Sequence, residues 1–186
     1  MLEIGVEDIA TIGLLSTTVE RMEIRNTLAG RALVVVIDDR AARGDTSDIQ
    51  GPLVSELLIE EGFLVDGTVV VSSEESEIRN ALNTAVIGGV DLVVSVGGTG
   101  VSPRDITPEV TIEMLDREIP GIGEALRSSA LSAGSIHGGL SRGVAGVSGS
   151  TLVVNLAGSR DSVRDGMATL GRLARHVIAE LSRVDD

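Results

Sequence analysis

Apolar, β-branched runs alternate with amphipathic segments along most of the chain. Residues 32–37 form a continuous apolar run, which is the pattern of a strand that is buried on both faces, and two further strands are expected at residues 69–71 and 91–96. Helical spacing of apolar residues predicts helices over residues 52–61, 74–87, 107–115, 121–130 and 162–181. Ser72 or Ser73 is expected to cap the second helix and Thr107 the third, with Pro108 at its first position.

Strands and helices in strict alternation predict an α/β fold, a three-layer α/β/α sandwich with a mostly parallel sheet. Two further strands are expected at residues 140–145 and 151–155, joined by a Gly-rich turn at 146–149. Residues 1–30 lack a clean period apart from a possible short helix. We expect an N-terminal extension at 1–30, which packs on the domain or on a neighbouring subunit, and one domain at 31–186.

Polar segments follow four of the expected strands, at residues 38–48, 72–75, 97–105 and 155–160. In open parallel sheets, ligands bind outside the carboxyl ends of the strands. The pattern therefore predicts that these four segments converge on one site.

Composition excludes several classes of function. The formal charge is −13 over 186 residues, which opposes general binding to nucleic acid or to anionic membrane. Phe63 is the single aromatic residue, so stacking on nucleotide bases is nearly unavailable. No cysteine is present, the two histidines form no metal-spaced pair, and neither a signal peptide nor a membrane span is visible. A cytoplasmic protein is expected.

The segment after the third strand carries the clearest chemistry. Glycines let the backbone turn tightly so that successive N–H groups bind an anion, and Gly97, Gly98, Thr99, Gly100 and Ser102 are candidates for holding phosphate. A plain Gly-rich turn is the alternative for the glycines. Arg104 can bind phosphate with two donors, and Asp105 is an oxygen ligand suited to Mg²⁺, although the two could also form a surface ion pair.

Other polar residues offer a second ligand site. Asp39, which follows a strand directly, and Asp48 are candidates for a metal or ribose contact, with Arg40 as the expected partner of Asp39. Ser141 and Arg142 could form a second anion clamp, and a structural role for the arginine is equally open.

Residues 95–109 resemble the signature of the MoaB/MogA family of molybdenum cofactor biosynthesis proteins, in particular its actinobacterial MoaB-type branch. Further matches lie at Asp39-Arg40, Gly51-Pro52, residues 117–121, Ser141-Arg142 and residues 155–159. The resemblance implies a molybdopterin-binding fold and Mg²⁺-dependent adenylylation of molybdopterin by ATP. It also implies a homotrimer or hexamer, with room for a further protein partner.

By this resemblance, Asp105 would be the catalytic, metal-linked aspartate. The glycine-rich residues, with Arg104, Ser141, Arg142, Asn155, Gly158 and Ser159, would hold phosphate or molybdopterin.

The chain departs from the family pattern at two places. Ser72 and Ser73 stand where the family has a Pro-Asp pair, so Glu74 is the carboxylate left to contact the second ligand. Ala157 and Arg160 replace two prolines, which fix a ligand-facing turn in the family. A second hypothesis is therefore a binding or regulatory module on the same fold that no longer catalyses the transfer.

Overall fold

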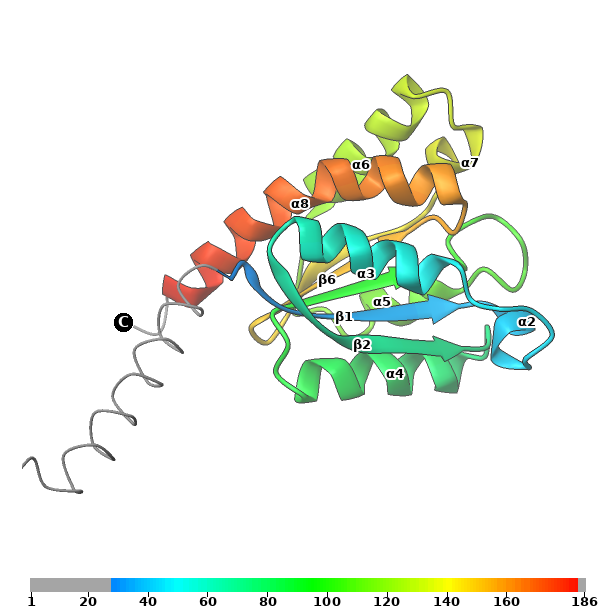
Figure 1. Ribbon diagram of the computed structural model, residues 1–186, viewed down its shortest axis with the longest axis horizontal. Coiled ribbons are helices and arrows are strands. Elements are labelled where there is room, and N and C mark those ends of the chain that lie inside the picture. The colour runs from blue at the N-terminus through cyan, green and yellow to red at the C-terminus, as the bar shows by residue number, and fades with distance from the viewer. Residues whose placement is uncertain (1–27, 184–186) are drawn as a thin grey trace, which may run out of the picture.

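The computed structural model describes residues 28–183 (Figure 1). The expected extension and its short helix lie almost wholly outside this range. The strands are β1 (Gly30–Ile37), β2 (Phe63–Val71), β3 (Leu92–Val96), β4 (Arg117–Glu118), β5 (Ala145–Ser148) and β6 (Thr151–Leu156). The helices are α2 (Asp39–Ala42), α3 (Gln50–Glu60), α4 (Glu75–Ile87), α5 (Thr107–Ile112), α6 (Pro120–Ser132), α7 (Ile136–Gly139) and α8 (Arg160–Ser182).

The six strands form one sheet in the order β2-β1-β3-β6-β5-β4. The four strands β2, β1, β3 and β6 are parallel, and β5 and β4 add antiparallel pairs at one side. The expected mostly parallel sheet is confirmed. Strand β1 lies between β2 and β3. The connection that follows β1 leads to β2 on one side, and the connection that follows β3 leads to the opposite side, so a crevice opens between the ends of β1 and β3, where ligands bind in such sheets.

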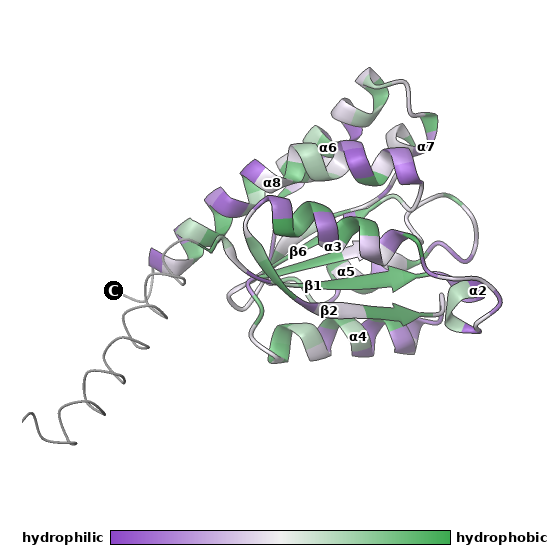
Figure 2. Ribbon diagram, in the orientation of Figure 1, coloured by the Kyte–Doolittle hydropathy of each residue, from purple (hydrophilic) through white to green (hydrophobic). Residues whose placement is uncertain are grey.

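Helices cover both faces of the sheet, as expected for three layers (Figure 1). One core packs α3, α6 and α8 against the sheet, and the other packs α4 and the residues around α5 against its opposite face. Strands β3 and β6 and the second half of β1 are buried, which explains their mostly apolar sequences, and β1 and β2 appear as mainly hydrophobic ribbons in Figure 2.

Strand β2 is longer than its clear apolar run. Its first half contains Asp66 and Gly67, which hide the strand pattern. The register with β1 shifts here, because Ala32 pairs with Val65 while Leu33 pairs with Gly67. Asp66 is thus the extra residue of a bulge, and its carboxylate pairs with Arg31 at 2.5 Å.

Three local predictions were wrong. The strand expected at 140–145 and the turn expected at 146–149 are misplaced, because α7 ends at Gly139 and strand β5 spans Ala145–Ser148. The intervening chain follows the glycine-rich turn, where the Arg142 N–H donates to the Thr99 carbonyl at 2.8 Å. Glu74 rather than a serine occupies the N-cap position of α4, without a capping side-chain hydrogen bond, and Ser72 instead bonds to Glu77. Ile106 occupies the N-cap position of α5, also without such a bond, and the Thr107 hydroxyl donates to the Gly97 carbonyl instead.

Candidate functional site

The four polar segments do converge at the carboxyl ends of the parallel strands. Arg104, after β3, reaches Asp39, after β1, and the Ser73 N–H, after β2, donates to Asp39 Oδ1 at 2.8 Å. Gly97 bonds through its N–H to the Leu156 carbonyl of β6 at 3.0 Å. Segments that are far apart in sequence therefore form one continuous surface beside β1, as the alternating pattern predicted.

The glycine-rich turn needs its glycines for steric reasons. Gly97 and Gly98 have φ values of 102° and 62°, in the region that side chains disfavour. A Cβ on Gly97 would lie 2.4 Å from the Ile37 carbonyl oxygen, and one on Gly98 would lie 2.3 Å from Thr107 Oγ1. The buried Thr107 hydroxyl donates to the Gly97 carbonyl at 3.0 Å, which ties the turn to α5.

The turn presents unused backbone donors. Within residues 28–183, the N–H groups of Gly98, Thr99 and Gly100 donate to no protein acceptor. The left-handed conformation of Gly98 aims consecutive N–H groups toward one side of the backbone, which is the arrangement that binds anions. This cradle, residues 97–100, can hold a phosphate group.

Asp105 lies at the end of the cradle. Its Oδ2 accepts the Ser102 N–H at 2.9 Å and lies only 2.8 Å from where a Cβ on Gly100 would be. In the described part of the chain, no three acidic or histidine side chains are grouped as a metal cage. Mg²⁺ commonly uses one or two carboxylates together with substrate phosphates, so Asp105 beside a phosphate cradle fits this ion.

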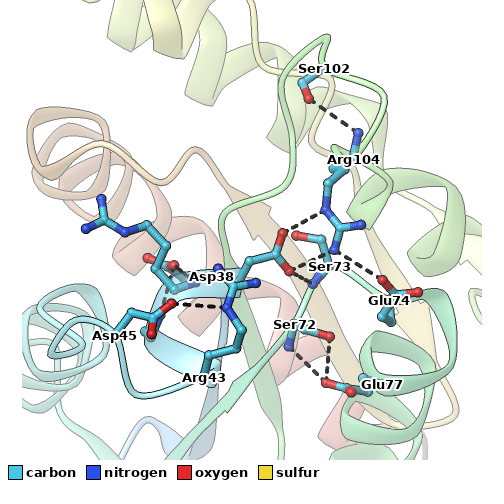
Figure 3. A network of polar contacts seen from close by, with 12 residues as sticks. Asp38, Arg43, Asp45, Ser72, Ser73, Glu74, Glu77, Ser102 and Arg104 are labelled. Atoms are coloured by element: carbon cyan, nitrogen blue, oxygen red, sulfur yellow. Dashed lines mark hydrogen bonds and ion pairs between the residues drawn. The ribbon is translucent and has the colours of Figure 1, made fainter.

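Arg104 joins two carboxylates across three strand ends (Figure 3). Its Nε and a terminal nitrogen donate to Asp39 at 2.7 and 2.9 Å, and the same terminal nitrogen lies 3.2 Å from Glu74 Oε1. The expected pairing of Asp39 with Arg40 is wrong. The acidic Asp39–Arg104–Glu74 group, termed the ion-pair network below, could not be inferred from sequence spacing.

The contacts within the ion-pair network shift the pKa values of Asp39 and Arg104. The Arg104 guanidinium, helped by the Ser73 N–H, lowers the pKa of Asp39 from 3.8 to about 2. Hydrogen bonds from Asp39 and then Glu74 raise the pKa of Arg104 above its usual value. Both groups stay charged at neutral pH, so a phosphate that binds Arg104 has to compete with two carboxylates.

Ser141 and Arg142 form hydrogen bonds to the cradle and to the segment that follows it. The Ser141 hydroxyl donates to Thr99 Oγ1 at 2.9 Å, and Thr99 is buried. Arg142 Nε donates to the Gly100 carbonyl at 2.7 Å, and its terminal nitrogens bond to the Asp105 carbonyl and to Glu109. Its three nitrogens are thus used within the protein, which favours loop positioning over the anion clamp that was the other reading.

The side chain of the buried Asn155 forms its hydrogen bonds within the protein. Its amide nitrogen donates to Ser95 at 2.8 Å and to Thr111 at 3.0 Å, and its carbonyl accepts the Val144 N–H at 3.2 Å. The residue is 2% exposed. A direct ligand contact by Asn155 stays a prediction, while its structural role joins β3, α5 and the segment before β5.

The remaining predicted residues line the other flank of the cradle. Asp48 accepts the N–H groups of Gln50 and Gly51, at 2.9 and 3.0 Å, at the start of α3. Ser159 caps α8 by accepting the Ser162 N–H. The Gln50 amide donates to the Gly158 carbonyl at 3.1 Å, a connection that the sequence analysis missed because no local pattern signals it.

Two concavities flank the cradle. One, of about 330 Å³, is lined by Asp48, Ile49, Gln50, Pro52, Leu53 and Arg160. The other, of about 300 Å³ and more polar, is lined by residues of α6 and of the 141–145 segment, among them Arg127, Ser141 and Arg142. A phosphate cradle between two pockets suits a ligand, or a pair of ligands, joined through phosphate.

The doubly wound sheet, with a glycine-rich turn and its unused N–H groups at the switch point, defines an α/β protein whose candidate site suits a phosphate group. The family model for the probable molybdopterin binding domain matches residues 33–176, and the chain belongs to this family of molybdenum cofactor biosynthesis proteins. The expected family is confirmed. No helix within residues 28–183 is long and apolar enough to cross a membrane.

Individual relatives support the same assignment. The crystal structure of a molybdopterin biosynthesis protein from Mycobacterium abscessus is 64% identical, with a TM-score of 0.82 over 85% of this chain and 99% of that one. A molybdopterin adenylyltransferase from Pyrococcus furiosus is 31% identical over 78% of this chain and 87% of its own length. A molybdenum cofactor biosynthesis bifunctional protein from Synechococcus elongatus is 34% identical over 83% of this chain, which spans about half (48%) of that longer protein.

Proposed function

We propose that this protein transfers an adenylyl group from ATP to molybdopterin, with Mg²⁺, to give adenylyl-molybdopterin and pyrophosphate. In this reaction a phosphate oxygen of molybdopterin attacks the α-phosphorus of ATP, and the bond from that phosphorus to the β-phosphate oxygen breaks. The name of the Pyrococcus furiosus relative supports the activity.

The observation that carries the proposal is the cradle of residues 97–100 with its unused N–H groups, next to the Asp105 carboxylate. The attacking and the leaving group of this reaction are both anionic phosphates. Hydrogen-bond donors close to both of them are needed to neutralise their negative charge, and one turn of backbone can supply such donors. Pockets on both sides of the cradle offer room for two substrates.

The protein's contribution is positioning and charge neutralisation. The N–H groups of Gly98, Thr99 and Gly100 would hold the reacting phosphates, and Asp105 would hold Mg²⁺, which supplies further neutralisation of the phosphate charge. Arg142 keeps the Gly100 and Asp105 carbonyls in place, so the donors and the metal ligand stay in register.

Arg104 would leave part of the ion-pair network when phosphate arrives. A phosphate, like the carboxylate of Asp39, can accept two parallel N–H bonds from a guanidinium, so a ligand phosphate could take the place of a carboxylate at Arg104. Asp39 and Glu74, thus released, would face the second ligand, which is where the sequence analysis placed them.

One observation favours a second function, binding of molybdopterin without transfer. Ser73 is neutral, and Asp39 and Glu74 already bind Arg104, so Asp105 is the carboxylate next to the cradle that forms no ion pair among the described residues. With one free carboxylate next to the cradle, metal binding depends heavily on the substrates, and turnover could be lost while binding persists.

The test is a turnover assay with molybdopterin, ATP and Mg²⁺, in which adenylyl-molybdopterin is detected by chromatography. We expect product from the wild-type protein and none from Asp105→Ala, with an unchanged circular dichroism spectrum for the variant. Full activity of Asp105→Ala would remove the role given to this residue. Molybdopterin binding without product in the wild type would establish the second function instead.

A further inference from the structure

The pocket between the starts of α3 and α8 has its own chemistry. It is mostly apolar, with Ile49, Pro52 and Leu53 on its walls, and its volume of about 330 Å³ is that of a small-molecule site. Ile49 is 64% exposed, so its side chain offers apolar surface to a ligand in this pocket. The walls suit a flat, uncharged ring.

The pocket is continuous with the cradle. Gln50, on its wall, donates to the Gly158 carbonyl at 3.1 Å, and the Gly158 backbone packs on Gly97, where an added Cβ would lie 3.2 Å from the Gly97 Cα. One residue therefore separates the pocket from the phosphate cradle. A ligand with a phosphate near Gly97 can place its attached ring in the pocket.

Arg160 is the cation on this pocket. Among residues 28–183 it forms no ion pair, and Asp48, the carboxylate that lines the same pocket, accepts the N–H groups of Gln50 and Gly51 instead. Its guanidinium is thus available to an anion, in contrast to Arg104 and Arg142, which are engaged within the protein.

The place of Arg160 in its helix is unfavourable for stability. It is the first residue of α8, directly after the cap Ser159, where the positive end of the helix dipole disfavours a cation. Asp161, in the same turn, suits that position. Helix stability therefore does not explain an arginine here, whereas ligand binding does.

We propose that Arg160 is a specificity-determining residue, which binds the phosphate of a phosphorylated heterocycle whose ring occupies the α3–α8 pocket. This rests on the proposed function, in which both substrates are phosphate esters of a heterocycle. Arg160 would set the preference for the phosphorylated over the unphosphorylated form, since a guanidinium gives two donors to phosphate oxygens.

The experiment is isothermal titration calorimetry of the full chain with adenosine, AMP and molybdopterin as separate probes. For Arg160→Ala we expect about a tenfold loss of affinity for AMP or for molybdopterin, the size of one charge-assisted contact, and no loss for adenosine. Which of the two phosphorylated probes is affected identifies the substrate that the pocket takes. Arg160→Lys should recover part of the affinity.

Two variants serve as controls. Arg164→Ala removes the same charge from an exposed position one turn further along α8, and should leave all three affinities unchanged. Ile49→Ala should weaken AMP and adenosine by the same factor if the nucleoside occupies the pocket. The thermal midpoint of Arg160→Ala should not fall, because the helix loses an unfavourable charge.

The proposal is overturned if Arg160→Ala keeps full affinity for both phosphorylated probes, if Arg164→Ala loses as much, or if the wild type binds no probe. Failure of the proposed function looks different: Arg160-dependent binding without adenylyl-molybdopterin in the turnover assay would support this site and reject the transfer reaction.

Discussion

Arg104 binds both carboxylate oxygens of Asp39, at 2.7 and 2.9 Å, across 65 residues of sequence. The contact joins the loop after β3 to the loop after β1, and Glu74 extends it to the loop after β2. It therefore holds together the strand ends that carry the candidate site.

The acid stability of the protein should reflect this contact. Arg104 lowers the pKa of Asp39 to about 2, so the contact stabilises the folded state fully above pH 4 and is lost as the pH falls from about 4 to 2. In urea unfolding followed by circular dichroism, Asp39→Asn should lower the midpoint at pH 6 and flatten its decline below pH 4. Asp45→Asn, a loop carboxylate that bonds to Arg43 instead, is the control and should retain the decline. An identical pH profile for Asp39→Asn and the wild type would contradict the role of the pair.

Gly97→Ala should destabilise the protein severely. The new Cβ would meet the Ile37 carbonyl at 2.4 Å at a φ of 102°, and neither backbone segment can move without disturbing the sheet. We expect a loss of more than about 3 kcal/mol in the free energy of unfolding, the sum of strain and overpacking. Gly44→Ala is the matched control: its φ is 78° and nothing lies within 4 Å, so strain of about 1 kcal/mol remains. Equal losses in the two variants would show that the contact with Ile37 is unimportant.

Asn155→Ala separates a structural from a ligand-binding role. The variant removes the bonds of Asn155 to the Val144 N–H and to the Ser95 and Thr111 hydroxyls in a buried site, although Thr111 keeps its bond to the Thr107 carbonyl, at a cost of roughly 2–4 kcal/mol. Urea unfolding measures this loss, with the exposed Asn80→Ala as control. A stable Asn155→Ala protein that has lost ligand affinity would favour the direct contact that the family resemblance implies.

Arg142→Met tests whether this arginine positions the cradle. The variant removes the bonds from Arg142 to the Gly100 and Asp105 carbonyls. Turnover should therefore fall at least about tenfold. The Mg²⁺ concentration that gives half-maximal activity should rise, because Asp105 is no longer held in position. The unfolding midpoint should change little, since the side chain lies at the surface. Glu109→Gln removes the third partner alone and should have a smaller effect. Lost substrate affinity with an unchanged Mg²⁺ requirement would point to an anion clamp.

The sequence by itself determined the layers and the edge of the sheet at which the candidate site lies. The apolar strands at 32–37 and 92–96 can be stable only when helices cover both faces, and parallel strands bring their carboxyl ends to one edge. Gly97, Gly98 and Asp105 were recognisable because the chemistry of a cradle lies within one short segment.

Tertiary structure decided which side chains are free to act. Asp39 pairs with Arg104 rather than with its neighbour Arg40, and Thr107 bonds to Gly97 rather than capping its helix, because packing brings a distant partner closer than the local one. Arg142 and Asn155 are candidate ligand residues by sequence but are hydrogen-bonded within the protein, whereas Arg160 lies beside a pocket and forms no ion pair with any other residue of 28–183. Such competition for partners depends on three-dimensional distance, which no local pattern records.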